Sequence, residues 1–406
     1  MKGGIFKNIG PATLVTAAFI GPGTITVCSV AGIKYGYQLM WAMILSVVAT
    51  IVIQELAIRI SMTTGKGLPQ VVKESLGNHP FLKWMMIVLI FSAIVVGNAA
   101  YEAGNLSGAI GGLELIGGGA WESRYLLALI PGGIAFLFLV VGSYKLVERL
   151  LIACVVIMSM AFIASAVMSQ PEVGLLVKGL FIPRFPDESL FTILGLIGTT
   201  VVPYNIFLHS NLVNEKWNGV EGLASAKKDL YISVLLGGVI SMCIIICGAA
   251  VSQKEGVALE FSELSRGLEP LLGDFSIIFL GIGLLAAGLS SAVTAPLAAA
   301  YVARDSFSWP SDTKNIKFRL VWGSILLIGL VICSTGYSPT TIIQFAQVAN
   351  GILLPVIVIV LIYLVNQKSI MKGRENGIWQ NVLACGIGLV SVLLGIKGLN
   401  KVFDFF

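Results

Sequence analysis

The chain has 406 residues, of which 56% are hydrophobic and 12% are charged, and its formal net charge at pH 7 is +5. Soluble domains carry roughly 25% charged residues, so this composition excludes an ordinary soluble protein. It indicates a polytopic membrane protein, and the small net charge gives no reason to expect a nucleic-acid partner. The six cysteines lie in apolar runs without a metal-ligand pattern, so we expect neither a metal site nor a cofactor.

Apolar runs of helical length recur along the whole chain, and we predict eleven membrane-spanning helices. The first run begins a series of similar runs and has no cleavage pattern, so we interpret it as a span and not as a signal peptide. The predicted spans cover roughly residues 11–33, 39–60, 82–110, 125–141, 147–168, 188–213, 229–251, 272–303, 319–335, 341–366 and 379–396.

The first span is interrupted in its middle by Gly21-Pro22-Gly23, which Thr24 follows. Proline removes a backbone donor and clashes with the preceding turn, and glycine weakens a helix. Inside a bilayer, each freed backbone group costs several kcal/mol unless something satisfies it. We therefore expect this break to line a cavity.

The third span contains Glu102, one helical turn before Asn105. An acidic residue inside a span indicates a functional site, and burial favours the neutral form of a carboxyl group. Glu102 is therefore a candidate proton carrier. The alternatives are a neutral, hydrogen-bonded structural acid and an acid that lies closer to the outer water.

The sixth span, "LGLIGTTVVPYNIFLHSNLV", is also interrupted in its middle, at Pro203. His209 in this span is a second candidate proton group, although a lone His in a helix is more often a structural residue. Polar side chains surround the break; they are Thr199, Thr200, Tyr204 and Asn205.

The two broken spans occupy equivalent positions if residues 11–168 and 188–366 form two five-helix repeats. Repeats with an odd number of spans have opposite topology in the membrane, and a pair of broken helices in such repeats indicates a transport site near the midplane. The alternative is that Pro22 and Pro203 are ordinary kinks, since other spans also contain proline.

Four motifs together resemble one known family. They are Gly21-Pro22-Gly23-Thr24, Val202-Pro203-Tyr204-Asn205, the eighth-span stretch "LLAAGLSSAVTAPLA" and Gln347-Val348. The chain is similar over nearly its whole length to the NRAMP family of proton-coupled divalent-metal transporters. The resemblance implies a single transporter domain with the LeuT-like fold, in which spans 1, 2, 6 and 7 rock against spans 3, 4, 8 and 9. The helix at 379–396 follows the two repeats.

This chain departs from the family's pattern at the metal site. The resemblance implies that metal is held by Asp and Asn of the first helix, Met of the sixth helix and a nearby backbone carbonyl. The matching positions here are Gly21, Thr24, Val202 and the carbonyl of Thr199. A transition-metal ion needs sulfur, imidazole or carboxylate ligands and compensating charge, and these residues supply none.

The family's proton-handling residues are also mostly replaced. In the resemblance, its acidic pair of the third helix falls on Asn105 and Gly108, and its first sixth-helix His becomes Tyr204. His209 and Gln347 match the family. The proton-coupling candidates are therefore Glu102, Asn105 and His209.

The leading prediction is a secondary-active transporter of NRAMP-like architecture that moves a small anion, carboxylate or zwitterion. The predicted substrate-binding residues are Gly21, Pro22, Gly23, Thr24, Thr199, Thr200, Val202, Tyr204, Asn205 and Gln347. One alternative is a transporter of Mg²⁺ or Mn²⁺, and another is a channel or a sensor. No nucleophile–base pair or phosphate loop indicates an enzyme.

The distribution of positive charge predicts the orientation. With the N-terminus inside, 18 of the 26 Lys and Arg residues fall on the cytoplasmic side, as the positive-inside rule requires. We expect an integral protein of a bacterial-type inner or plasma membrane, with its C-terminus outside. Its expected partners are the lipid bilayer and a small solute or ion, and the sequence is compatible with a monomer.

Overall fold

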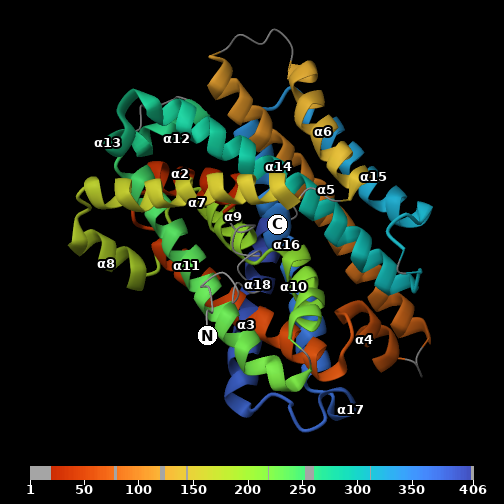
Figure 1. The fold of residues 1–406 in the computed structure, drawn as a ribbon. Coiled ribbons are helices and arrows are strands. Elements are labelled where there is room, and N and C mark those ends of the chain that lie inside the picture. Colours follow the sequence, from red (N-terminus) through yellow and green to blue (C-terminus); the bar gives the residue numbers. More distant parts are fainter. Residues whose placement is uncertain are drawn as a thin grey trace, which may run out of the picture.

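The computed structural model describes residues 20–76, 80–118, 124–142, 145–217, 219–251, 260–310 and 312–403. All regular structure within these residues is helical (Figure 1). The long helices are α2 (Pro22–Tyr35), α3 (Met40–Thr64), α5 (Pro80–Gly117), α6 (Arg124–Val141), α7 (Lys145–Met168), α9 (Leu190–Thr200), α10 (Pro203–Lys216), α11 (Leu223–Ala249), α14 (Ser276–Phe307), α15 (Ile316–Cys333), α16 (Pro339–Val365) and α18 (Ile378–Phe403).

Shorter helices, none of which the sequence analysis predicted, lie between the long helices. They are α4 (Leu68–Ser75), α8 (Val173–Phe181), α12 (Phe261–Ser265), α13 (Glu269–Leu272), α17 (Lys368–Met371) and the 3₁₀ turns η2 (Val220–Gly222), η3 (Arg266–Leu268) and η4 (Gly273–Phe275).

Within the described residues, nine segments are long and apolar enough to cross a membrane, and the broken pair α9 and α10 counts as one of them. A tenth apolar helix, Leu126–Val141, is shorter. Helix α2 corresponds to the second half of the first predicted span, whose first half lies outside the described residues. The all-helical membrane fold is therefore confirmed, while the number of eleven spans stays a prediction.

Helices α5 and α14 pack extensively against each other, and they approach closely through glycines. A Cβ on Gly112 of α5 would lie 2.5 Å from the carbonyl oxygen of Gly281 in α14, and one on Gly288 would lie 2.6 Å from the carbonyl oxygen of Asn105. Small residues at such crossings let two backbones pack directly against each other.

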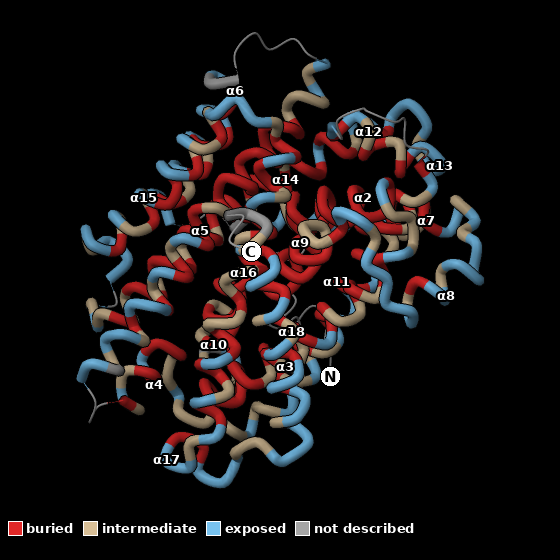
Figure 2. Tube along the Cα trace, turned by 180° about the vertical axis from the view of Figure 1, so that it is seen from behind, coloured by how far each residue is buried: buried red, intermediate tan, exposed pale blue. Residues whose placement is uncertain are grey.

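Buried residues run through the middle of the bundle, and exposed residues mark its outer helices, such as α6 and α15 (Figure 2). The exposed residues on these helices are largely apolar; Leu137 of α6 and Leu327 of α15 are 60% and 62% exposed. Apolar side chains on the outside of a membrane-spanning bundle face lipid. The core therefore consists of helix–helix contacts, and the perimeter is left for the bilayer.

Both predicted breaks coincide with helix starts. Helix α10 begins at Pro203 after two non-helical residues that follow Thr200, and α2 begins at Pro22 after the extended Gly21. Proline fits the first position of a helix because its missing N–H has no intrahelical partner there. These two prolines therefore start helices, whereas Pro131, Pro296 and Pro355 lie inside α6, α14 and α16.

Candidate transport site

Two threonines join the two break regions. The hydroxyl oxygens of Thr24 in α2 and Thr199 in α9 are 2.8 Å apart, and both residues are buried. The first turn of α2 thereby meets the last turn of α9, across 175 positions of sequence. This contact is the structural centre of the predicted substrate site.

Gln347 of α16 lies against both broken elements. A Cβ on Gly23 would meet the amide of Gln347, and one on Gly198 would meet the carbonyl oxygen of Gln347. These two glycines are needed because α16 passes so close to α2 and α9. The Oε1 atom of Gln347 is buried and has no hydrogen-bond partner among the described residues.

Other predicted site residues lie around this centre but point elsewhere. Pro22 packs against α5, where a Cβ on Gly108 would meet its ring. The Thr200 hydroxyl donates to the carbonyl of Leu196 at 3.1 Å and lies 3.8 Å from the sulfur of Met43 in α3. Thr200 therefore faces α3 and not the Thr24–Thr199 pair.

Tyr204 takes part in an aromatic contact that the sequence analysis missed. Its ring meets that of Tyr101 in α5 edge-on, with centroids 5.2 Å apart, and both rings are almost fully buried. Val202 belongs to the same small cluster, together with Ala295 and Ala298 of α14. The position that holds a sulfur ligand in the NRAMP pattern is thus packed in an apolar and aromatic environment. One sequence signal could have identified Tyr101 as a residue of this region: it directly precedes Glu102 within a predicted span.

Asn205 and His209 lie one turn apart on one face of α10, and this face is directed to α3. The His209 Nδ1 atom is 2.9 Å from Oε1 of Gln54 in α3. Both amide atoms of Asn205 are buried and have no hydrogen-bond partner among the described residues. The sequence analysis did not name Gln54 as a candidate site residue. The signal that could have identified it is an uncharged polar side chain in the middle of an apolar span.

Glu102 lies away from the threonine pair. A Cβ on Gly329 of α15 would be 2.7 Å from Glu102 Cγ, whereas Gly108, about 120° around the same helix, faces Pro22 of α2. Asn105 Nδ2 donates to Glu102 Oε2 at 3.5 Å, and the carboxyl is fully buried. The carboxyl is therefore enclosed by protein, while its depth in the membrane stays a prediction.

The chemistry of the candidate site is neutral in the part of the chain that the structure describes. Its side chains offer hydroxyl and amide groups, and the described part has no cluster of three His, Cys, Asp or Glu that would hold a metal ion. Among the side chains whose burial the structure describes, Glu102 and Arg59 are the buried charged ones. The N-terminal ends of α2 and α10 add partial positive charge at the breaks.

Comparison with known proteins finds relatives that align with nearly the whole chain. The divalent metal cation transporter MntH of Bacillus subtilis is 29% identical over 403 residues, which are 97% of this chain and 92% of the relative. The transporter of the same name from Nostoc is 29% identical over 415 residues, covering 96% of this chain and 89% of the relative.

Solved structures share the fold. The manganese transporter of Eremococcus coleocola superposes with a TM-score of 0.77 at 18% identity, covering 99% of this chain and 88% of the other. MhsT in complex with L-phenylalanine gives a TM-score of 0.61 at 15% identity, over 97% of this chain and 98% of the other. The fold is therefore LeuT-like.

A family model described as "Natural resistance-associated macrophage protein-like" matches residues 12–400. The match spans both break regions, the α5–α14 core and the helices that follow. This chain is a membrane transporter that belongs to the Nramp family.

Proposed function

We propose that this Nramp-family transporter moves a small anion, carboxylate or zwitterion and not a transition-metal ion. The observation that carries the proposal is the neutral chemistry around the Thr24–Thr199 contact, since the described residues contain no group of three His, Cys, Asp or Glu side chains that could hold a metal ion. A divalent ion without compensating charge is very unfavourable in a buried site. The N-terminal ends of α2 and α10 favour a negatively charged group instead.

A ligand screen tests this proposal directly. Purified protein is titrated with Mn²⁺, Cd²⁺ and Mg²⁺ and, separately, with small anions and amino acids, and the shift in apparent melting temperature is measured. We expect a shift from a member of the second set and none from the metals. Saturable Mn²⁺ uptake by proteoliposomes at micromolar concentration would contradict the proposal.

The double variant Thr24→Val/Thr199→Val separates binding from stability. Replacing both partners of a hydrogen bond by apolar groups of the same shape is nearly neutral for folding. We expect this variant to purify like the parent protein and to lose the ligand-induced shift. If the variant keeps the full shift, the threonine pair is not part of the binding site.

Proton coupling is part of the proposal, through Glu102 or His209. Both groups are buried and hydrogen-bonded to a neutral amide side chain, Asn105 and Gln54 respectively. Uptake that responds to a pH gradient in the parent protein and not in Glu102→Gln would assign the proton to the carboxyl. The same loss in His209→Gln would assign it to the imidazole.

Transport of Mg²⁺ or Mn²⁺ is the second candidate, because the curated relatives are named divalent metal cation transporters. It predicts metal uptake by the parent protein and its loss in Glu102→Gln. The triple variant Gly21→Asp/Thr24→Asn/Val202→Met distinguishes the two candidates, since it restores the ligands of the NRAMP pattern. The leading proposal predicts Mn²⁺ binding only in this variant, whereas the second candidate predicts it in both proteins.

A further inference from the structure

One face of α11 is polar near the N-terminal end of the helix, which follows α10, and apolar further along the helix. Ile232, Leu235, Leu236 and Val239 are 50% to 57% exposed, and their spacing places them on one side of the helix. Such a stripe on a membrane-spanning helix faces acyl chains. One to two turns earlier, the same side carries Ser225, Lys228 and Asp229.

A surface hollow of about 340 Å³ opens at this change of polarity. Its lining comes from the end of α10 and the first turns of α11 and consists of Lys216, Trp217, Ser225, Lys228, Asp229 and Ile232. Two lysines and one aspartate leave this lining with a net positive charge. Ile232 belongs both to the hollow and to the apolar stripe, so the two surfaces are continuous.

The residues around the hollow are held in place. The Lys216 ammonium lies 5.0 Å from the centre of the Trp217 ring. A Cβ on Gly222 would lie 2.5 Å from Cβ of Trp217, so the start of the Trp217 side chain lies directly against Gly222. The next lysine, Lys227, is tied to Glu55 of α3 at 2.7 Å. Lys228 instead lies at the hollow and is exposed.

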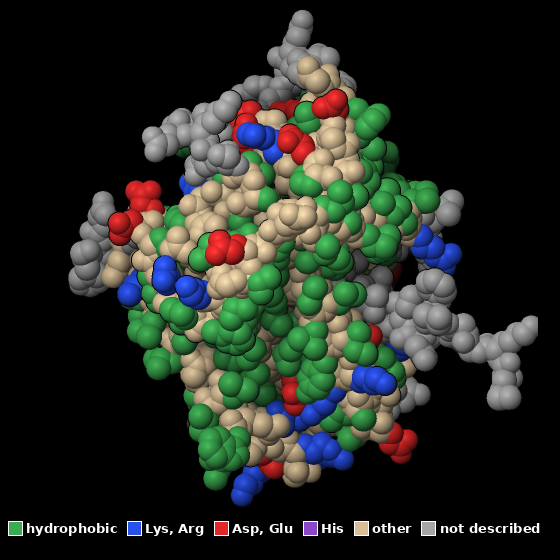
Figure 3. Space-filling model, turned by 90° about the vertical axis from the view of Figure 1, so that its left-hand side faces the viewer, with side chains coloured by type: hydrophobic (Ala, Val, Ile, Leu, Met, Phe, Trp, Pro, Cys, Tyr) green, Lys and Arg blue, Asp and Glu red, His purple; other side chains and the backbone are tan. Residues whose placement is uncertain are grey.

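We propose that this hollow binds the headgroup of an anionic phospholipid. The phosphate lies between Lys216 and Lys228, the Trp217 ring lies at the level of the membrane interface, and an acyl chain follows the stripe from Ile232 to Val239. Lysines attract anionic headgroups, and tryptophan is typical of the interface. Figure 3 views the side of the molecule on which α8 and α11 lie, and Lys and Arg side chains gather at its lower end below hydrophobic ones.

The test measures lipid binding to the full-length protein in detergent, by native mass spectrometry and by the shift in apparent melting temperature. The probes are phosphatidylglycerol, phosphatidylcholine and inorganic phosphate. We expect a stabilising shift with phosphatidylglycerol alone. The same shift with inorganic phosphate would mean a free-phosphate site, and equal binding of phosphatidylcholine would mean that charge has no role; either result overturns the proposal.

Two matched double variants locate the site. Lys216→Gln/Lys228→Gln should weaken phosphatidylglycerol binding roughly 10- to 30-fold. Lys368→Gln/Lys372→Gln makes the same change of charge at exposed residues of α17 and the turn after it and should bind like the parent protein. Equal weakening by both double variants would mean that the lipid is attracted by positive charge in general and not by this hollow, and it would overturn the proposal. Lys228→Gln alone gives the same comparison if the first double variant does not purify.

Discussion

Single glycines decide how closely the helices of the candidate transport site approach one another. Gly198 in the last turns of α9 faces the backbone of α16, because a Cβ there would meet the carbonyl oxygen of Gln347. Gly195, one turn earlier, has more space: its Cβ would lie 3.1 Å from Val27 Cγ1 and 3.9 Å from Gln347 Cβ. Two glycines on one helix therefore differ in what a methyl group would displace.

Gly198→Ala should therefore destabilise the protein by about 1–3 kcal/mol, the usual cost of overpacking. A backbone carbonyl cannot rotate away, so α9 and α16 must separate and the Thr24–Thr199 contact must shift. Gly195→Ala is the control, because the Val27 side chain can adjust. Apparent melting temperatures of the two variants in one detergent make the comparison, and equal values would contradict the assigned difference.

The positions of the helices along the chain were predictable from the sequence, whereas the direction in which each face of a helix points was not. Apolar length and proline are local signals, so the starts of α2 and α10 at Pro22 and Pro203 followed from them. The Thr24–Thr199 contact joins residues that are far apart in sequence, and only the packed bundle decides that Glu102 faces α15. Short connecting helices such as α8 lack the length of a span, so no signal predicted them.

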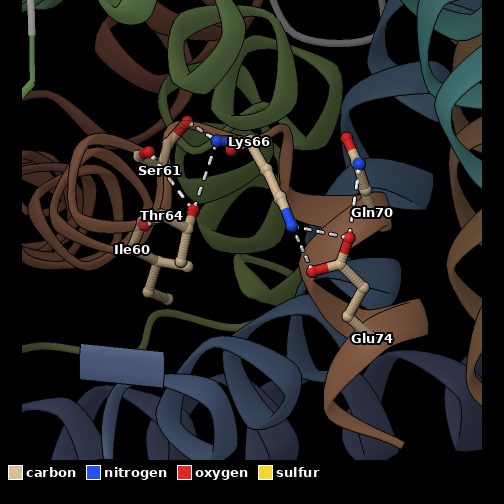
Figure 4. Close-up of polar contacts among 6 residues, drawn as sticks. All are labelled: Ile60, Ser61, Thr64, Lys66, Gln70 and Glu74. Carbon is tan, nitrogen blue, oxygen red and sulfur yellow. Dashed lines mark hydrogen bonds and ion pairs between the residues drawn. The ribbon is translucent and has the colours of Figure 1, made fainter. Parts of the chain in front are cut away.

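The corner between α3 and α4 shows how one buried hydroxyl holds three elements together. The Ser61 Oγ atom lies 2.8 Å from the carbonyl oxygen of Lys66 and 2.5 Å from that of Ser210 in α10. It also accepts a hydrogen bond from Asn214 Nδ2 at 2.7 Å. Figure 4 shows this corner, in which Lys66 also forms an ion pair with Glu74 at 2.6 Å.

Ser61→Ala should destabilise this corner by about 1–3 kcal/mol, because Asn214 Nδ2 loses its acceptor in a partly buried position. Lys66→Ala removes the ion pair, whose side chains are 39% and 50% exposed, and should cost less than about 1 kcal/mol. Hydrogen exchange of residues 61–75 and 203–216 measures both changes. Faster exchange in Lys66→Ala than in Ser61→Ala would contradict this ranking.

At the scale of the whole molecule, the Nramp match and the apolar perimeter place the chain in a membrane, and the charge bias predicts its direction. The end of α10 and the start of α11, with Lys216, Lys227 and Lys228, lie on the side predicted to be cytoplasmic. The α16–α18 connection, with Lys368, Lys372 and Arg374, lies on the same predicted side. Moving such clusters across a bilayer is costly. The hollow proposed for an anionic headgroup would then face the inner leaflet.

Reporter fusions test this orientation on the intact chain. Alkaline phosphatase is active only outside the inner membrane and green fluorescent protein fluoresces only inside, so a C-terminal phosphatase fusion should be active and the corresponding fluorescent fusion dark. The same reporters inserted after Gly219, between α10 and α11, should give the opposite pair of results. A fluorescent C-terminal fusion would reverse the prediction and move the Lys216–Lys228 hollow to the outer leaflet, because both features depend on the same direction of insertion.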